Sequence, residues 1–401
     1  MVRQLEPDPC ILLKGEGDHF ILGWDFEASL KLELTTFSFD VLQEFLDEFS
    51  GYYIFGYLSY DIKNKIEANL KSSHPDQVGF PDVHFVVPKH VLEQKNGKQT
   101  YFGAADITDV SALFDVKKDT AQKNYFPVDL KPKTSREDYL KNVMQILEEI
   151  RFGNIYELNY CVQFSADNAA IDPFETFLKL HRLSEAPFSV YLNTGTHAVM
   201  SASPERYMQK VSHRLISQPI KGTARRGNSE IEDEKIKLEL QQNSKERAEN
   251  IMIVDLVRND LSRIAEKNSV QVDELCGVYS FKTVHQLIST VSCKIRPDVN
   301  FTDVIKATFP MGSMTGAPKI SAMQLAERVE NFRRGLYSGT IGYIHPSGDY
   351  DFNVVIRSIL YNSKTKVVSC GVGGAITVNA EPEKEYEECL LKLQALQKAL
   401  C

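Results

Sequence analysis

Apolar and polar residues alternate along two stretches of the N-terminal region, residues 10–34 and 83–103. A period of two is typical of β-strands, because successive side chains point to opposite faces of a sheet. Asn96 and Gly97 interrupt the second stretch and favour a tight hairpin turn. We therefore expect the N-terminal region to form a sheet, interrupted by a helix near Asp40–Phe49.

From Ser135 onward the pattern changes to a helical period. Ser135 and Asp138 form a capping box, and the apolar residues that follow share one face, which predicts a helix over 136–151. The later predicted elements are a helix over 173–183, strands over 188–192, 197–203, 206–211 and 214–219, one or two helices over 230–265, and a helix after Pro382.

The composition is that of a globular enzyme, with 43% hydrophobic and 25% charged residues among 401. This length fits two or three domains or one intertwined α/β body. Residues 117–133 lose the apolar pattern to Lys, Asp, Pro and Gln, so we expect a linker there and a domain boundary near residue 130. The first residues lack a signal pattern and no long apolar run occurs, so we expect a cytoplasmic protein without a membrane partner.

Charge and cysteine spacing exclude further classes. The net charge of −8 and the absence of a basic stripe argue against nucleic acid as a partner. The seven cysteines are too far apart for a C-x-x-C metal or redox site, and none lies in the G-x-C-x-G elbow of a glutamine amidotransferase. We therefore expect reduced thiols and a chain that cannot hydrolyse glutamine by itself.

The run Pro-Ile-Lys-Gly-Thr at 219–223 is the first candidate for chemistry. It places Lys221 at the end of a predicted strand and Gly222 directly after it. Such a lysine is either a solvated charge entering a turn or a nucleophile held by a strand. Pairing of neighbouring strands can bring it next to Glu205, 16 residues earlier.

Two pairs of glutamates have i, i+3 spacing, Glu246/Glu249 and Glu385/Glu388. On a helix each pair shares a face, which is either a solvated acidic face or part of an ion site. Gly-rich turns expected at 312–316 and 371–374 are either plain loops or sources of backbone N–H groups for an anion. Together these features suit a site for a small, highly charged acid.

Six stretches resemble the chorismate-utilising enzymes, and they follow one another over the last two thirds of the chain. They are S-P-E at 203–205, P-I-K-G-T at 219–223, K-E-R-A-E-N-I-M-I-V-D-L-V-R-N-D at 245–260, F-P-M-G-S-M-T-G-A-P-K at 309–319, S-G-T-I-G-Y at 338–343 and G-V-G-G-A at 371–375. The resemblance implies an α+β chorismate-binding fold with two packed, mainly antiparallel sheets flanked by helices. Residues 1–130 would form a β-rich region that matches the family loosely, intertwined with a catalytic region over 131–401.

The resemblance also implies a bound Mg²⁺. In the family two E-x-x-E helices face each other and hold an ion that binds the ring carboxylate of the substrate, which points here to Glu246, Glu249, Glu385 and Glu388. Mg²⁺ keeps several waters, so we expect Glu249 and Glu388 to touch the ion and the other two to act through water. The ion would also reverse the field of an acidic chain for an anionic substrate.

The candidate substrate contacts follow from the family's motifs. They are Thr223, Gln286, Thr315, Gly316, Tyr343, Arg357, Gly373, Gly374 and Ala375. In the family, the loop matching 310–318 helps to close over the substrate, and G-V-G-G-A resembles a backbone cradle for a carboxylate. Tyr343 and Arg357 match positions that hold the enolpyruvyl carboxylate, which an arginine can meet with two parallel hydrogen bonds.

Within the family, Lys221 favours the aminodeoxychorismate synthases, which often use this lysine covalently, whereas anthranilate and isochorismate synthases carry alanine there. The amine would attack C2 of chorismate as the 4-hydroxyl leaves, and ammonia would then add at C4 and expel the lysine without loss of pyruvate. The attacking amine must be neutral, so Lys221 needs a lowered pKa or a neighbouring base. Glu205 would protonate the departing hydroxyl.

Three further positions bear on the reaction. Gln286 replaces a histidine that anthranilate synthases associate with pyruvate elimination. His285 would face the other side of the strand, so we expect a structural role for it. Glu157 stands where the family usually has glutamine, or a water-activating lysine in isochorismate synthases, and the sequence offers no reason for a glutamate.

The resemblance therefore implies amination of chorismate with ammonia to 4-amino-4-deoxychorismate, a step of 4-aminobenzoate and folate biosynthesis. A glutamine amidotransferase subunit, component II, is the expected partner. Anthranilate synthase component I is the alternative, and a non-catalytic subunit that keeps the fold for partner binding is a third. The sequence leaves open the oligomeric state, the stability of any complex with component II, and whether the N-terminal sheet binds tryptophan or another ligand.

Overall fold

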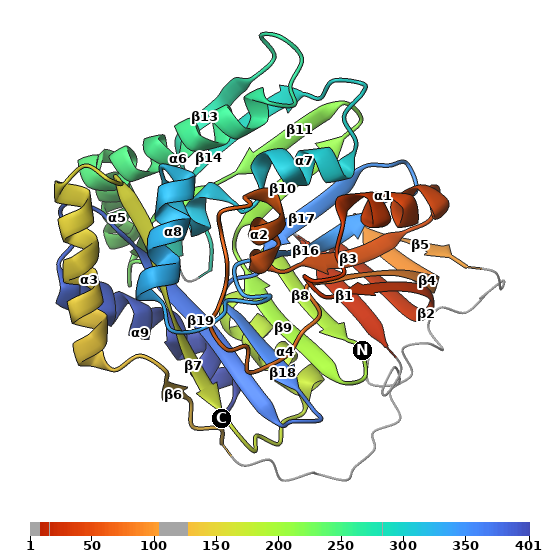
Figure 1. The fold of residues 1–401 in the computed structure, drawn as a ribbon, viewed down its shortest axis with the longest axis horizontal. Coiled ribbons are helices and arrows are strands. Elements are labelled where there is room, and N and C mark those ends of the chain that lie inside the picture. The colour runs from red at the N-terminus through yellow and green to blue at the C-terminus, as the bar shows by residue number, and fades with distance from the viewer. Residues whose placement is uncertain (1–8, 16, 104–126, 283) are drawn as a thin grey trace.

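The fold is α+β, as the sequence predicts, and its strands pair in antiparallel fashion (Figure 1). The computed structural model describes residues 9–15, 17–103, 127–282 and 284–401. All strand pairings among these residues are antiparallel, and they join the strands into one continuous ladder. Two long strands divide this ladder into two sheets.

The first sheet runs through six strands that pair in succession. They are β7 (Glu157–Ala166), β19 (Val367–Ile376), β18 (Ser358–Asn362), β9 (His197–Ser203), β8 (Phe188–Asn193) and β1 (Cys10–Lys14). Two short strands, β6 (Lys131–Pro132) and β15 (Gly316–Ala317), also pair with β7.

The second sheet continues the ladder beyond the two long strands. Its strands are β3 (Ile54–Leu58), β16 (Thr340–Ile344), β17 (Tyr350–Val354), β10 (Arg206–Val211), β11 (Arg214–Gln218), β14 (Val284–Lys294) and β13 (Gln271–Ser280). The strand β12 (Ile220–Arg225) pairs with β14 beyond the end of β11.

The long strands β2 (Phe20–Leu32) and β4 (Val83–Lys95) connect the two sheets. The first half of β2 pairs with β1, and the first half of β4 pairs with β3. Their mutual register shifts between Phe26 and Ala28, and a bulge of this kind bends a pair of strands. The strand β5 (Lys98–Phe102) completes the hairpin predicted at Asn96 and Gly97.

The first sheet is buried on both faces. Ile11 and Val199 share a core cluster with Phe55 and Tyr207 of the second sheet, which is the core between the sheets. The alternate residues, such as Leu12, belong to a second cluster with α3 (Arg136–Arg151), α4 (Pro173–Ser184) and α9 (Pro382–Ala399). The predicted alternation of apolar and polar residues therefore holds only for the outer half of β2, because the other half has two buried faces.

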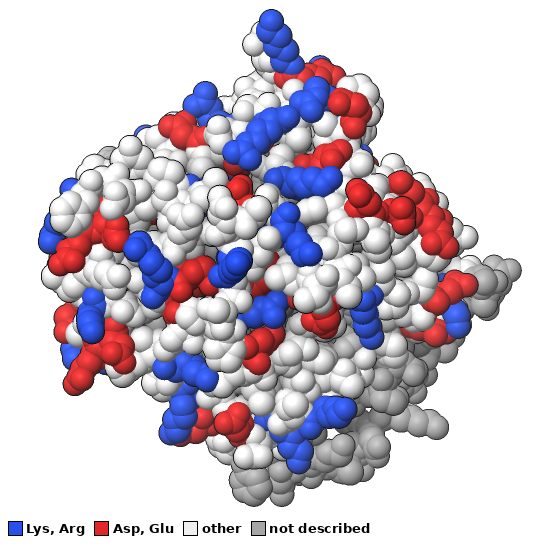
Figure 2. Space-filling view, in the orientation of Figure 1, with Lys and Arg blue, Asp and Glu red and all other residues white. Residues whose placement is uncertain are grey.

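Further helices cover the second sheet (Figure 1). The helices α1 (Phe39–Glu48), α6 (Ser244–Ser262) and α7 (Phe301–Thr308) add residues to the core between the sheets. The remaining helices are α2 (Lys63–Ile66), α5 (Glu230–Gln242) and α8 (Lys319–Val329). Of the helices in the described ranges, none combines the length and apolar character needed to cross a membrane. Lys and Arg are interspersed with Asp and Glu over the face seen in Figure 2.

Several predictions of local structure are confirmed. The helix over 136–151 begins where the Ser135 side chain accepts the N–H of Asp138. The region 230–265 forms two helices because Asn243 ends α5 and caps α6. Of the predicted linker, residues 117–126 lie outside the described residues. The division of the chain near residue 130 stays a prediction, and strands pair across that position, β1 with β8 and β3 with β16.

Candidate active site

Lys221 lies in a β-bulge. The register of β12 against β14 shifts between Ile220 and Thr223, so Lys221 and Gly222 fall outside the regular ladder. Gly222 has a φ of 93°, which glycine adopts without strain. A Cβ atom there would also come within 3.1 Å of Oε2 of Glu246. The bulge therefore re-aims the lysine and lets α6 approach the strand closely.

The Lys221 side chain is directed at Glu157, at the start of β7. Its Nζ donates to Oε1 of Glu157 over 2.7 Å, and only 10% and 0% of the two side chains are exposed. Burial lowers the pKa of Lys221, but the charge and hydrogen bond of Glu157, followed by the charges of Glu249 and Glu205, raise it above the ordinary lysine value. Of the two ways to obtain a neutral amine, the lowered pKa is absent and the neighbouring carboxylate is present.

Glu205 lies at the corner between β9 and β10. Its backbone carbonyl accepts the N–H of Val354 at 3.0 Å, which ties the corner to β17. Burial raises the pKa of the Glu205 carboxyl to about 7, against the opposing effects of Ser313, Lys221 and the N–H of Ile220. The group can therefore donate or accept a proton near neutral pH.

The two glutamate pairs lie on α6 and α9, and their charges act on one another across the helices. Burial raises the pKa of Glu246, and the charge of Glu388 adds to this while Lys245 opposes it. Burial, with the charges of Glu388 and Glu249, raises the pKa of Glu385 to about 7. The charges of the four carboxylates therefore act on one another in one acidic region, an arrangement that the resemblance implied and that the i, i+3 spacing alone did not.

A lysine that the sequence reading missed borders this region. Nζ of Lys392 lies 2.5 Å from Oε1 of Glu388 and donates to the carbonyl oxygen of Gly373 at 2.7 Å. Desolvation raises the pKa of Glu388, but the charge and hydrogen bond of Lys392 outweigh it and lower the pKa. The i, i+4 spacing from Glu388 to Lys392 was the available signal.

The chemistry of the acidic region suits Mg²⁺. Carboxylate oxygens are the ligands that this ion prefers, and three of the four glutamates have a raised pKa that a bound cation would relieve. In the described part of the chain, no three His, Cys, Asp or Glu side chains are grouped so as to hold a metal ion. Mg²⁺ commonly uses one or two carboxylates and several waters, so one glutamate from each helix is sufficient.

The expectation of a turn at 371–374 is wrong, because these residues are part of β19. The strand pairs with β7 without interruption from Val368 to Ile376, and Gly373, Gly374 and Ala375 lie in this ladder. A Cβ atom at Gly374 would lie 3.3 Å from Oε2 of Glu385, so the glycine allows α9 to approach. The described strands do not pair with the other edge of β19 beyond Ser369, where backbone N–H groups can meet a carboxylate.

The loop at 312–316 forms a short 3-10 turn followed by β15. The Thr315 hydroxyl donates to backbone oxygens within the loop, and its carbonyl accepts the N–H of Asn159. Gly316 has a φ of 138°, and a Cβ atom there would lie 2.1 Å from the carbonyl oxygen of Glu157. The loop therefore fixes the backbone that carries Glu157, and α8 begins directly after it at Lys319.

Tyr343 is not among the groups whose charges act on Arg357. Arg357 has a left-handed φ of 52°, and no hydrogen bond or ion pair joins its guanidinium to the described residues. Burial lowers its pKa, and Tyr337 and Glu388 are the groups whose charges oppose this. Tyr343 instead packs on Tyr53, with ring centroids 6.2 Å apart, and the charges that act on it are those of Asp351, Glu93, Arg206 and Asp349. The tyrosine near Arg357 is therefore Tyr337, which the sequence reading missed.

Thr223 and Gln286 face each other across β12 and β14. Gln286 is buried and its Oε1 has no hydrogen-bond partner among the described residues, which suits a ligand that donates a proton. His285 lies on the other face of β14, where its ring nitrogens contact Asp233 at 2.9 Å and Ser280 at 2.8 Å. These contacts tie the β13–β14 hairpin to α5, in keeping with the structural role expected for His285.

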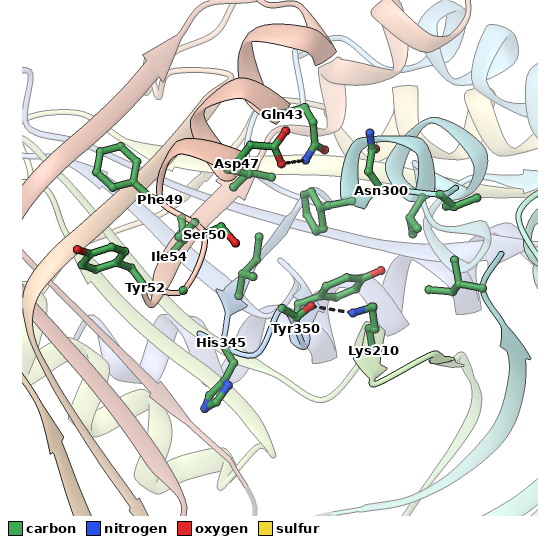
Figure 3. A pocket seen from close by; sticks show the side chains of 18 residues that line it. Gln43, Asp47, Phe49, Ser50, Tyr52, Ile54, Lys210, Asn300, His345 and Tyr350 are labelled. Carbon is green, nitrogen blue, oxygen red and sulfur yellow. Dashed lines mark hydrogen bonds between the residues drawn. The ribbon is translucent and has the colours of Figure 1, made fainter. Parts of the chain in front are cut away.

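A separate cavity of about 230 Å³ lies between α1, α7 and the β16–β17 hairpin (Figure 3). Figure 3 shows Gln43 and Asp47 of α1 on one side and Lys210, His345 and Tyr350 on another. The residues that line it include none of the predicted site residues. The cavity is thus distinct from the site around Lys221.

Comparisons with known proteins agree with the fold and the motifs. The family described as chorismate binding enzyme matches residues 8–398. The aminodeoxychorismate synthase of Arabidopsis thaliana chloroplasts is 34% identical over 92% of this chain, which spans 43% of that relative. Aminodeoxychorismate synthase component 1 of Escherichia coli is 32% identical over 86% of this chain and 76% of its own length.

A solved structure has the same architecture. Anthranilate synthase component I from Streptococcus pneumoniae superposes with a TM-score of 0.83 at 25% identity, over 95% of this chain and 92% of the other. With the family match covering nearly the whole sequence, the chain belongs to the chorismate binding enzymes. The chain spans less than half the length of the Arabidopsis relative.

Proposed function

We propose that this protein aminates chorismate with ammonia to 4-amino-4-deoxychorismate through a covalent intermediate on Lys221. The observation that carries the proposal is the burial of Lys221 in a bulge, within range of the charges of Glu205 and Glu249. A lysine held inside a substrate site is in a position for nucleophilic attack, which a solvated lysine in a turn is not. The names of the two relatives point to the same product.

The substrate is an anion, and the proposed contacts match its charges. Mg²⁺ held by Glu249 and Glu388, with Glu246 and Glu385 acting through water, would bind the ring carboxylate. Arg357 with Tyr337 would meet the second carboxylate, since the guanidinium has no counter-ion of its own in the described chain. The rest of the substrate would contact the free edge of β19 at Gly373, Gly374 and Ala375. It would also contact Thr223, Gln286, Thr315 and Gly316.

The reaction would proceed by two displacements. The neutral amine of Lys221 attacks C2, both ring double bonds shift by one position, and the 4-hydroxyl leaves with a proton from Glu205, which matches a carboxyl group with a pKa of about 7. Ammonia then adds at C4, both double bonds shift back, and the lysine nitrogen leaves C2. Glu205 accepts the extra proton of the new amine, so one water is released for each ammonia consumed.

A glutamine amidotransferase subunit would supply the ammonia. Six of the seven cysteines are buried, and the seventh, Cys401, is the last residue. None lies in a nucleophile elbow, so glutamine hydrolysis requires a partner.

Anthranilate synthase activity is the alternative, and the structural similarity to such an enzyme supports it. Incubation of the purified chain with chorismate, Mg²⁺ and an ammonium salt, followed by chromatography and mass spectrometry, separates the two. The proposal predicts 4-amino-4-deoxychorismate, which retains the enolpyruvyl group. Fluorescent anthranilate as the main product, formed without an added lyase, would overturn it.

A further inference from the structure

Glu157 is a buried carboxylate without an assigned task. It is fully buried at the start of β7, and its backbone pairs with Ala317. Gly316 can lie close to this backbone because it has no side chain. Oε1 accepts the hydrogen bond from Lys221, whereas Oε2 is buried and has no partner among the described residues. A buried carboxylate with one free oxygen is poorly solvated in its charged form, which costs free energy.

We propose that Glu157 is the base that takes the proton from Lys221 before the lysine attacks the substrate. The inference rests on the proposed covalent role of Lys221 and adds a residue to it. In the resting pair, Lys221 is an ammonium and Glu157 a carboxylate. A shift of one proton along the 2.7 Å hydrogen bond gives a neutral amine and a neutral carboxylic acid.

The surroundings favour this acceptor over the other carboxyl groups. The carboxylates that interact with the charge of Lys221 are Glu157 from β7, Glu205 from the β9–β10 corner, Glu246 and Glu249 from α6, and Glu388 from α9. Only Glu157 has a hydrogen bond to Nζ in the described residues. Glu205 is needed in its protonated form for the leaving hydroxyl. A bound substrate excludes water, and in a dry site a neutral pair is less costly than an ion pair.

The protons balance over the cycle. The proton of the Lys221 ammonium moves to Glu157, and the neutral amine forms the bond to C2. When ammonia has added at C4, the C2–N bond breaks and the lysine leaves as a neutral amine. Glu157 then returns its proton to Lys221, so the resting ion pair is restored without any other donor or acceptor.

The proposal has a specific consequence for pH dependence. Because the pair holds one shared proton, the fraction able to react does not depend on exchange with the solvent over the neutral range. Glutamine at position 157 can donate and accept hydrogen bonds but cannot take the proton. In that variant Lys221 must lose its proton to solvent, so its reactive fraction rises tenfold per pH unit until its pKa is reached.

The test is the pH profile of kcat/KM for chorismate in Glu157→Gln, divided by that of the parent at a fixed concentration of free ammonia. The division removes the titration of Glu205, which both enzymes share. We expect the variant to be at least ~10²-fold slower at pH 6, as for loss of a general base, with the ratio rising tenfold per pH unit. Glu157→Asp keeps a carboxylate and should give a ratio that is flat with pH.

A different pattern would overturn the proposal. If Glu157 only holds the lysine protonated, the parent rate itself rises tenfold per pH unit, and Glu157→Gln is faster than the parent at pH 7. A folded Glu157→Gln enzyme with the parental profile also excludes the base role. The product of the parent enzyme is identified in the same assays, so failure of the proposed function appears as the wrong product or none, whatever the variant does.

Discussion

Nζ of Lys221 lies 2.7 Å from Oε1 of Glu157, although 64 positions separate the two residues in the chain. The contact joins β12 of the second sheet to β7 of the first. It means that the proposed nucleophile rests as a buried ammonium and not as a free amine. The proton of this ammonium and the nearby negative charges determine when Lys221 can act as a nucleophile.

The proposed metal site predicts that catalysis requires Mg²⁺ and that Glu249→Gln or Glu388→Gln removes most of the activity. Loss of a ligand charge should weaken the binding of Mg²⁺ by at least ~10-fold, because even residues that only hydrogen-bond to a metal ligand change metal affinity by that much. The fold should survive, since glutamine keeps the volume of the side chain. Kinetics over a Mg²⁺ titration measure the effect.

Glu383→Gln is the matched control. It removes a charge from α9, the helix of Glu388, at an exposed ion pair with Arg136. It should leave the Mg²⁺ dependence unchanged. Parental activity of Glu249→Gln and Glu388→Gln in the presence of a chelator would refute the metal assignment.

The same carboxylates predict how Mg²⁺ affects stability at different pH values. The pKa of Glu385 is raised from its ordinary value to about 7 in the folded protein, so between about pH 4.5 and 7 this carboxyl group binds a proton in the folded state that it lacks in the unfolded state. Without metal, the contribution of Glu385 to stability therefore falls as pH rises through this range, and the loss is complete above pH 7.

A bound cation relieves the repulsion only where the carboxylates are charged. Mg²⁺ should therefore raise the unfolding temperature more at pH 8 than at pH 5.5, as measured by calorimetry with and without a chelator. An equal shift at both pH values would contradict this explanation. The Glu249→Gln variant, measured in parallel, should show little shift at either pH.

Glu205 predicts the alkaline side of the activity profile. Its pKa of about 7 means that the acid form, which protonates the leaving hydroxyl, disappears as pH rises through neutrality. The rate should fall above pH 7, and Glu205→Gln should be slower by ~10² to 10⁴-fold, as for loss of a general acid. Retention of the alkaline limb in a Glu205→Gln enzyme would assign that titration to another group.

Much of the fold could be predicted from the sequence because local signals were strong. Ser135 caps a helix that begins at the expected residue, and Asn96 and Gly97 turn the expected hairpin. The glycines near residue 373 were misread as a turn. A Cβ atom at Gly371 would collide with the ring of Tyr337, and one at Gly373 would collide with the backbone of β7, whereas Gly374 lies against Glu385 of α9. All three contacts involve residues distant in the sequence.

The site was predictable where motifs carry it and not where tertiary contacts do. Lys221, Glu205 and the four glutamates come from the motifs, and the charges of the two glutamate pairs act on one another between α6 and α9. Tyr343 and Tyr337 lie in the same short stretch, and only the packing of the strands brings Tyr337 and not Tyr343 near Arg357. The partner of Glu157 could not be predicted, because a bulge in a distant strand directs Lys221 toward it.

The absence of a cysteine elbow predicts that glutamine alone does not support turnover. The isolated chain should make product from ammonium salts, and glutamine should become a substrate only when a separate glutaminase subunit is added. Measurement of product with glutamine, before and after addition of the partner, tests this. Formation of product from glutamine by the isolated chain would contradict the need for a separate glutaminase subunit.

The most direct measurement for the whole account is the mass of the protein after incubation with chorismate and Mg²⁺ in the absence of ammonia. Because the second nucleophile is missing, rapid quenching and mass spectrometry should find a population that carries chorismate minus water, located on Lys221 by peptide mapping. Lys221→Ala, measured beside it, should lack the adduct and lose most of its product. A folded Lys221→Ala enzyme that forms 4-amino-4-deoxychorismate at the parental rate would contradict the covalent mechanism.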